Sequence, residues 1–180
     1  MIIKNLLIVL AVCLFAIVSF AQPNPAETAQ KLQEMKKLDG MVGRWEGSGW
    51  MISGAAKESF VGTETVQKKL DGLILLVEGN FKTPLVAGQE QKVVHQTLAV
   101  LSSNLKTRNY DFKTYLLNGS VGSQELNIVG DKWEWGFQFP GIFMKYTITI
   151  KDNVWSEIGE YSADGTKWKQ IFQMSLKKVV

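Results

Sequence analysis

Apolar and polar residues alternate with a period of two along most of the chain from Val42 onward. The alternation is clearest in three late stretches, where lysine, glutamate, glutamine, serine and threonine occupy most of the opposite positions. The residues predicted to share an apolar face are Trp133, Trp135, Phe137 and Phe139, then Ile142, Met144, Tyr146, Ile148 and Ile150, then Trp168, Phe172, Met174 and Leu176. A period of two is typical of strands that bury one face.

Turn signals separate these alternating segments at regular distances. They are Asp71-Gly72, Ser103-Asn104, Asn118-Gly119, Gly130-Asp131, Pro140-Gly141, Asp152-Asn153 and Asp164-Gly165. From Asn104 onward, the signals follow one another every 10 to 14 residues, which is typical of an antiparallel meander. The pattern predicts ten strands, at residues 42–53, 57–69, 73–82, 92–102, 107–117, 120–129, 132–139, 142–151, 154–162 and 166–178, with a loop at 83–91.

Ten strands with one apolar face can form two packed sheets or one closed barrel. Closure removes the unpaired edges that an open meander exposes. The sequence offers a single helix to cover a sheet, so we expect an all-β fold in which an up-and-down meander closes into a roughly ten-stranded barrel. A barrel of this size is wider than an eight-stranded one, which predicts a cavity or a bulky aromatic filling.

One helix precedes the strands. Pro25 suits a first helical position, and residues 26–38 are rich in good helix formers, with Ala29, Leu32 and Met35 recurring every three residues. Asp39-Gly40 is predicted to end this helix. We therefore assign residues 22–41 to a linker and helix, and residues 42–180 to the barrel domain.

The first 21 residues resemble a secretory signal more than a part of the fold. Lys4 precedes an almost unbroken apolar run from Leu6 to Phe20, and Ser19 and Ala21 suit a signal peptidase. The run is short for a membrane span, so we expect cleavage after Ala21, no stable membrane anchor, and a secreted or periplasmic protein. Cys13 lies within this segment, so the mature chain would have no cysteine, disulfide or thiolate nucleophile.

Charge excludes some partners. Cleavage would remove Lys4 and leave 19 basic and 17 acidic residues, a net charge of +2. Such a balance gives no electrostatic basis for binding nucleic acid.

A resemblance to a known superfamily joins the helix to the first strand. The stretch Leu38-Asp39-Gly40-Met41-Val42-Gly43-Arg44-Trp45-Glu46-Gly47-Ser48-Gly49 resembles the G-x-W signature of the calycins, which include lipocalins, fatty-acid-binding proteins and nitrobindin-like proteins. Residues 160–177 resemble a family of secreted bacterial lipocalin-like domains of unknown function. The resemblance implies a fold and a style of ligand binding without a settled activity. Nitrobindin-like proteins bind haem through a histidine near the C-terminal end, and residues 140–180 contain no histidine here.

Two polar residues on predicted strands are candidates for binding chemistry. His95 is the sole histidine, and it is either a structural residue or an axial ligand for haem or a metal. Glu64 shares strand parity with Phe60, Gly62 and Val66, so it points either into the barrel or, after a register shift, into solvent. An inward carboxylate would require a cation, such as Arg44 or Arg108, or a polar ligand group.

No arrangement of residues predicts catalysis, a cofactor or an ordinary metal site. The sequence has no G-x-S-x-G motif and no second histidine. We therefore expect a non-enzymatic barrel that binds a small apolar or amphipathic ligand. The alternatives are haem or metal binding through His95, or a filled barrel that serves as a structural or interaction domain. The residues expected at the ligand site are Trp45, Glu64, His95, Trp135, Tyr146 and Gln170.

Overall fold

The computed structural model describes residues 24–179, so the predicted signal sequence at 1–21 lies outside the described residues. The chain divides into two compact units, one up to Gln30 and one from Lys31 onward. Helix α2 (Pro25–Met35) begins in the first unit, where the backbone N–H of Ala26 donates to Asn24 Oδ1 at 3.1 Å. Asparagine thereby caps the helix, and Pro25 occupies the first helical position as predicted. Within residues 24–179, no helix has the length and apolar content needed to span a membrane.

The end of the helical segment differs from the prediction. Helix α2 stops at Met35, and a 3₁₀ helix, η2 (Lys36–Met41), follows it directly. Asp39-Gly40 was predicted to end the helix but lies inside η2. The reason is burial, because Leu38 is 0% exposed and Met41 is 2% exposed, and both belong to the core of the second unit.

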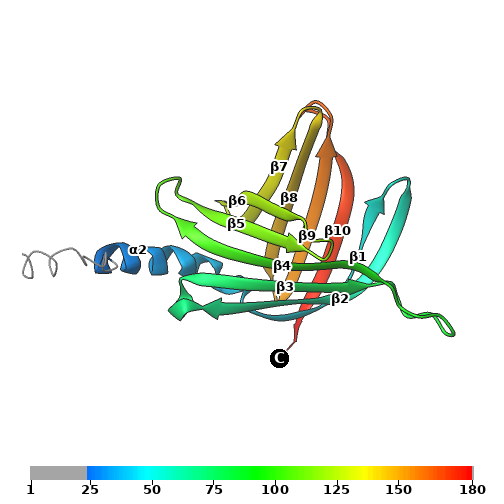
Figure 1. Ribbon diagram of the computed structural model, residues 1–180, viewed down its shortest axis with the longest axis horizontal. Helices are drawn as coiled ribbons and strands as arrows, with labels where there is room; N and C mark the ends of the chain where they lie inside the picture. Colours follow the sequence, from blue (N-terminus) through cyan, green and yellow to red (C-terminus); the bar gives the residue numbers. More distant parts are fainter. Residues whose placement is uncertain (1–23, 180) are drawn as a thin grey trace, which may run out of the picture. The chain divides into compact units, whose positions relative to one another are not determined.

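Ten antiparallel strands form a closed barrel, which confirms the predicted fold class (Figure 1). Each strand pairs with the next one along the chain, and β1 pairs with β10 to close the ring. A short 3₁₀ turn, η3 (Leu70–Gly72), joins β2 to β3. The strands are β1 (Gly43–Ser53), β2 (Ala56–Lys69), β3 (Ile74–Lys82), β4 (Val93–Asn104), β5 (Asn109–Leu116), β6 (Val121–Val129), β7 (Lys132–Phe139), β8 (Ile142–Lys151), β9 (Val154–Ser162) and β10 (Lys169–Val179).

The start of β10 corrects a second prediction. Trp168 was predicted to begin the apolar face of a strand starting at 166, but β10 begins at Lys169 and Trp168 is 37% exposed. Asp164 extends the turn before β10, since its Oδ1 accepts hydrogen bonds from the backbone N–H groups of Thr166 at 2.8 Å and Lys167 at 2.9 Å. The Trp168 ring instead lies on the surface, 4.7 Å from the Lys145 ammonium.

The hydrogen-bonded pairing between neighbouring strands is shortest at one place in the barrel wall. Strands β1 and β2 pair along the whole of β1, from Gly43 to Ser53. Strands β6 and β7, in contrast, pair only where residues 126–129 meet residues 132–135. The other half of β6 pairs with β5 alone, and the other half of β7 pairs with β8 alone. We call this short ladder the β6–β7 seam, and Figure 1 shows the two strands diverging beyond it.

Candidate functional site: a barrel cavity with two buried carboxyl groups

The barrel encloses a cavity of about 400 Å³. Its lining runs from Met41 of η2 to Leu116 and Val121, which flank the β5–β6 turn. Val121 is 59% exposed, so the cavity reaches the surface at this end. Most lining side chains are apolar, as alternation along the strands requires. The polar residues among them are Glu64, His95, Thr97, Thr114, Ser120, Gln124, Tyr146 and Glu157, and no lysine or arginine within residues 24–179 lines the cavity.

Glu64 points inward from β2, which is one of the two orientations that the sequence left open. Its Oε2 atom is buried and has no hydrogen-bond partner among the described residues. Glycine at position 79, on the neighbouring strand β3, makes room for the carboxyl group, because a Cβ there would lie 2.8 Å from Glu64 Oε1. Burial, and secondarily the charge of Glu157, raises the pKa of Glu64 to about 8.

Glu157 is the second inward carboxyl group, on β9, and it is 8% exposed. The indole N–H of Trp135 donates to its Oε1 at 3.1 Å. Burial raises the pKa of Glu157 to about 7, although this hydrogen bond and the nearby indole N–H of Trp155 both favour the charged form. The Trp155 N–H falls short of hydrogen-bond geometry and has no partner among the described residues.

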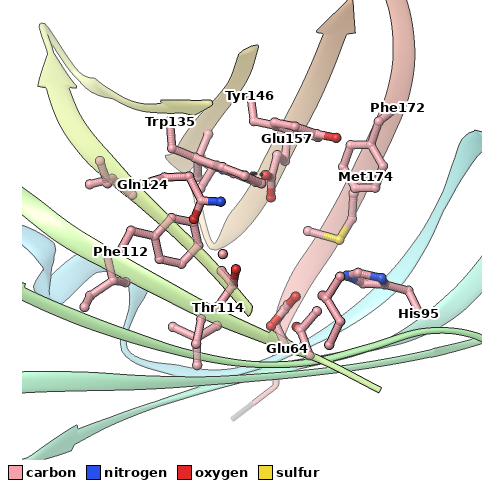
Figure 2. Close-up of a pocket in the computed structure, with 18 of the residues that line it drawn as sticks. Glu64, His95, Phe112, Thr114, Gln124, Trp135, Tyr146, Glu157, Phe172 and Met174 are labelled. Carbon is pink, nitrogen blue, oxygen red and sulfur yellow. Dashed lines mark hydrogen bonds between the residues drawn. The ribbon is translucent and has the colours of Figure 1, made fainter. Parts of the chain in front are cut away.

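The two carboxyl groups face the same space (Figure 2). Strands β1 and β10 separate β2 from β9 in the barrel wall, so Glu64 and Glu157 approach the cavity from different directions. Neither arginine that the sequence offered as a partner reaches them. Arg44 pairs with Glu46 at 2.6 Å, and Arg108 lies exposed in the β4–β5 turn.

Aromatic rings form one wall of the cavity. Trp135 and Tyr146 stack with ring centroids 4.2 Å apart and an interplanar angle of 8°. Phe112 meets the edge of this stack, with its centroid 5.1 Å from that of Trp135. Gly159 gives Tyr146 the space to lie flat, because a Cβ at that position would be 2.6 Å from the tyrosine ring. The stack therefore presents a rigid apolar surface beside Glu157.

His95 also lines the cavity, from β4, with its ring 6.5 Å from that of Phe81. Burial lowers the pKa of His95, so the imidazole is neutral at pH 7. Within the described residues, no group of three or more histidine, cysteine, aspartate and glutamate side chains is placed to hold a metal ion.

Two of the six predicted site residues lie outside the cavity. Trp45 is 0% exposed and packs below it, where its indole N–H donates to the Met41 carbonyl at 2.9 Å and its ring meets Trp155 edge to face. Gln170 is exposed, because a register shift between Gln170 and Phe172 reverses its side of β10. Glu64, His95, Trp135 and Tyr146 do line the cavity together.

Five further polar residues line the cavity that the sequence analysis did not include in the site: Glu157, Thr97, Thr114, Ser120 and Gln124. Strand parity could have identified three of them, because Glu157 shares its parity with Trp155, Thr114 with Phe112 and Gln124 with Leu126. Exposed apolar residues on the opposite face, such as Ile158 at 43% exposure, obscured that signal for β9.

Comparison with known proteins supports the fold and leaves the activity open. No protein-family model matches the chain, and no curated protein matches it by sequence. The fold is similar to that of Rv2717c from M. tuberculosis, with a TM-score of 0.59 and 13% identity over 82% of this chain and 98% of that one. A protein of unknown function from the DUF3598 family of Nostoc punctiforme aligns over 81% of this chain and 99% of that one, with a TM-score of 0.29 and 7% identity. The closed ten-stranded barrel is consistent with a calycin-like fold.

Proposed function

We propose that this chain is a lipocalin-like binding protein that holds a small amphipathic molecule inside its barrel. The observation that carries the proposal is the cavity of about 400 Å³, which has mainly apolar walls and two inward carboxyl groups. Ligand pockets in proteins typically measure roughly 300–1,000 Å³ and combine apolar walls with a few polar groups. The cavity matches this description in both volume and lining.

The buried carboxyl groups favour this function over a filled structural barrel. Burying a carboxyl group that lacks a partner costs free energy, and Glu64 Oε2 has no partner among the described residues. A barrel selected only for stability would gain by carrying an apolar residue at position 64. Perturbed carboxyl groups in a cavity are typical of sites that contact a ligand.

Haem binding through His95 is a second reading, and the lining fits it only in part. The neutral imidazole of His95 has the charge state that an iron ligand requires. However, haem carries two anionic propionates, whereas the cavity presents two carboxyl groups and, among the described residues, no lysine or arginine to pair with the propionates. Electrostatics therefore favours a different class of ligand.

The test is titration with N-phenylnaphthylamine, an uncharged fluorescent probe. We expect one saturable site in the unmodified protein. Thr114→Trp should weaken binding by about tenfold or more, because it fills the cavity. Lys113→Trp adds the same ring to the outer face of β5 and should leave binding unchanged.

Two results would count against the proposal. One is a folded protein that binds no probe and releases no small molecule to native mass spectrometry after purification from its own host. The other is a Soret band on addition of haemin that disappears in His95→Ala, which would favour the haem reading.

We further propose that the protein acts outside the cytoplasm, on the basis of the apolar run from Leu6 to Phe20 and the small residues at 19 and 21. Intact-mass analysis of the protein from periplasmic and culture fractions should give a chain that begins at Gln22. An uncleaved chain would contradict this localisation.

A further inference from the structure

We propose that the ligand carries a cation, namely an ammonium group on an apolar body, and that this group binds between Glu64 and Glu157. This inference rests on the proposed function, because it assigns the chemistry of the ligand held in the barrel.

The carboxyl pair has no cationic partner among the described residues. Glu64 and Glu157 line one cavity, and none of the described lysines and arginines lines it with them. The carboxylates of Glu34, Glu46, Asp39 and Glu160, by contrast, each pair with a lysine or an arginine. Carboxyl groups from two strands thus face the space between Glu64 and Glu157, and no positively charged side chain of the described residues pairs with them (Figure 2).

The two carboxyl groups retain hydrogen-bonding capacity that no protein group within residues 24–179 uses. Glu64 Oε2 has no partner among the described residues, and Glu157 receives one donor, from Trp135. An ammonium group has three N–H donors and no acceptor, so it can serve both carboxylates at once. A ligand carboxylate offers only acceptors when ionised, and it would add negative charge beside whichever of the two groups is ionised, in a site shielded from water. The site therefore selects against fatty-acid anions.

The cavity wall next to Glu157 is aromatic. The indole N–H of Trp135 donates to Glu157 Oε1 at 3.1 Å, and the Trp135 ring stacks on Tyr146. An ammonium group at Glu157 would therefore lie beside aromatic rings. Aromatic rings attract cations electrostatically and also pack against an apolar body. The same wall thus suits both parts of an arylalkylamine or alkylamine.

Binding of an ammonium group should release protons near neutral pH. The pKa values of Glu64 and Glu157 are raised to about 8 and about 7, so both groups are largely protonated below pH 7. A cation between them favours the charged forms, which frees their protons. His95 and Tyr146 are the other titratable groups that line the cavity, and both are neutral in this range, because the pKa of His95 is lowered and that of Tyr146 is raised to about 12.

The experiment compares three ligands with the same aromatic body: naphthylmethylamine, naphthalenemethanol and naphthaleneacetate. Isothermal titration at about pH 6.5, in two buffers with different ionisation enthalpies, measures affinity and proton release together. We expect the amine to bind about tenfold or more tightly than the alcohol and the acid, with proton release for the amine alone.

Variants assign the effect to the carboxyl pair. The double substitution Glu64→Gln and Glu157→Gln keeps side-chain size, so it should bring amine affinity down to that of the alcohol and abolish proton release. Its far-ultraviolet circular dichroism should match that of the unmodified protein, which shows that the barrel is intact. Glu58→Gln, at an exposed position on the same strand as Glu64, should behave like the unmodified protein.

The outcomes separate the two proposals. If the alcohol or the acid binds as tightly as the amine, the cation inference fails and the proposed function stands. If N-phenylnaphthylamine binds and none of the three compounds does, the inference also fails alone. If neither the probe nor any of the three binds to folded protein, both proposals fail.

Discussion

Replacing Glu64 with glutamine should stabilise the protein at alkaline pH and change little at acidic pH. Burial raises the pKa of Glu64 from 4.5 to about 8. Between these values the folded state holds a proton that the unfolded state has lost, so the free energy of unfolding falls as pH rises. The contribution of protonated Glu64 to the free energy of unfolding is fully present below pH 4.5, and it is lost as pH rises through about 8. Glutamine fills the same space without a charge, so it removes this loss.

The pKa values set the size of the effect. A difference of one pKa unit corresponds to 1.36 kcal/mol, so the rise from 4.5 to about 8 gives an upper limit of about 5 kcal/mol at pH 9. Water that enters the cavity reduces the cost of ionisation. We therefore expect Glu64→Gln to gain about 2–5 kcal/mol over the unmodified protein at pH 9, and about zero at pH 4.5.

Urea unfolding followed by tryptophan fluorescence at acidic and alkaline pH measures this gain. Glu58→Gln is the matched control, because Glu58 lies exposed on the same strand, β2. Glu157→Gln should show the same sign with a smaller gain, since the pKa of Glu157 is raised to about 7. If Glu64→Gln and the unmodified protein lose stability in parallel as pH rises, Glu64 is not the buried, protonated group described above.

Three further substitutions test other parts of the site. Trp45→Ala should cost about 3–5 kcal/mol in urea unfolding because the ring is fully buried, yet leave probe affinity per folded molecule unchanged; lost binding at unchanged stability would refute this placement. Trp135→Phe removes the N–H donor to Glu157 and should raise the pKa of that carboxyl group further, seen by carbon NMR titration, whereas an unmoved midpoint would argue against the hydrogen bond. Gly79→Ala places a Cβ 2.8 Å from Glu64 Oε1 and should cost about 1–3 kcal/mol in urea unfolding, whereas unchanged stability would contradict this close packing.

The strands could be predicted from the sequence because one buried face imposes a period of two on every segment. Parity alone left Glu64 either inside the barrel or in solvent, and the register of β2 with its neighbours places it inside. The prediction failed where local hydrogen bonds override the pattern. Asp164 extends the β9–β10 turn, which leaves Trp168 on the surface, and the register shift after Gln170 turns that side chain outward.

The sequence predicted either a cavity or a bulky aromatic filling, but the choice between them and the volume could not be predicted, since both depend on how side chains from different strands pack. The alternation pattern is consistent with Glu157 and Trp135 pointing inward, but it does not predict that the Trp135 indole N–H lies 3.1 Å from Glu157 Oε1. The hollow next to Glu64 likewise depends on Gly79, on a neighbouring strand. Such pairings arise from the register of the closed ring, which no single segment encodes.

The β6–β7 seam bears on how fast a molecule can enter and leave the barrel. Residues 126–129 and 132–135 carry the whole ladder there, so separating the two strands breaks fewer hydrogen bonds than separating β1 from β2. Gln124 and Phe137 line the cavity from the two diverging halves. Local opening at the seam would thus give a lateral route to the cavity at a free energy below that of global unfolding. In kinetic terms, a ligand would exchange through the opening beside Val121 and, on local opening, through this short ladder, and neither route requires the whole barrel to unfold.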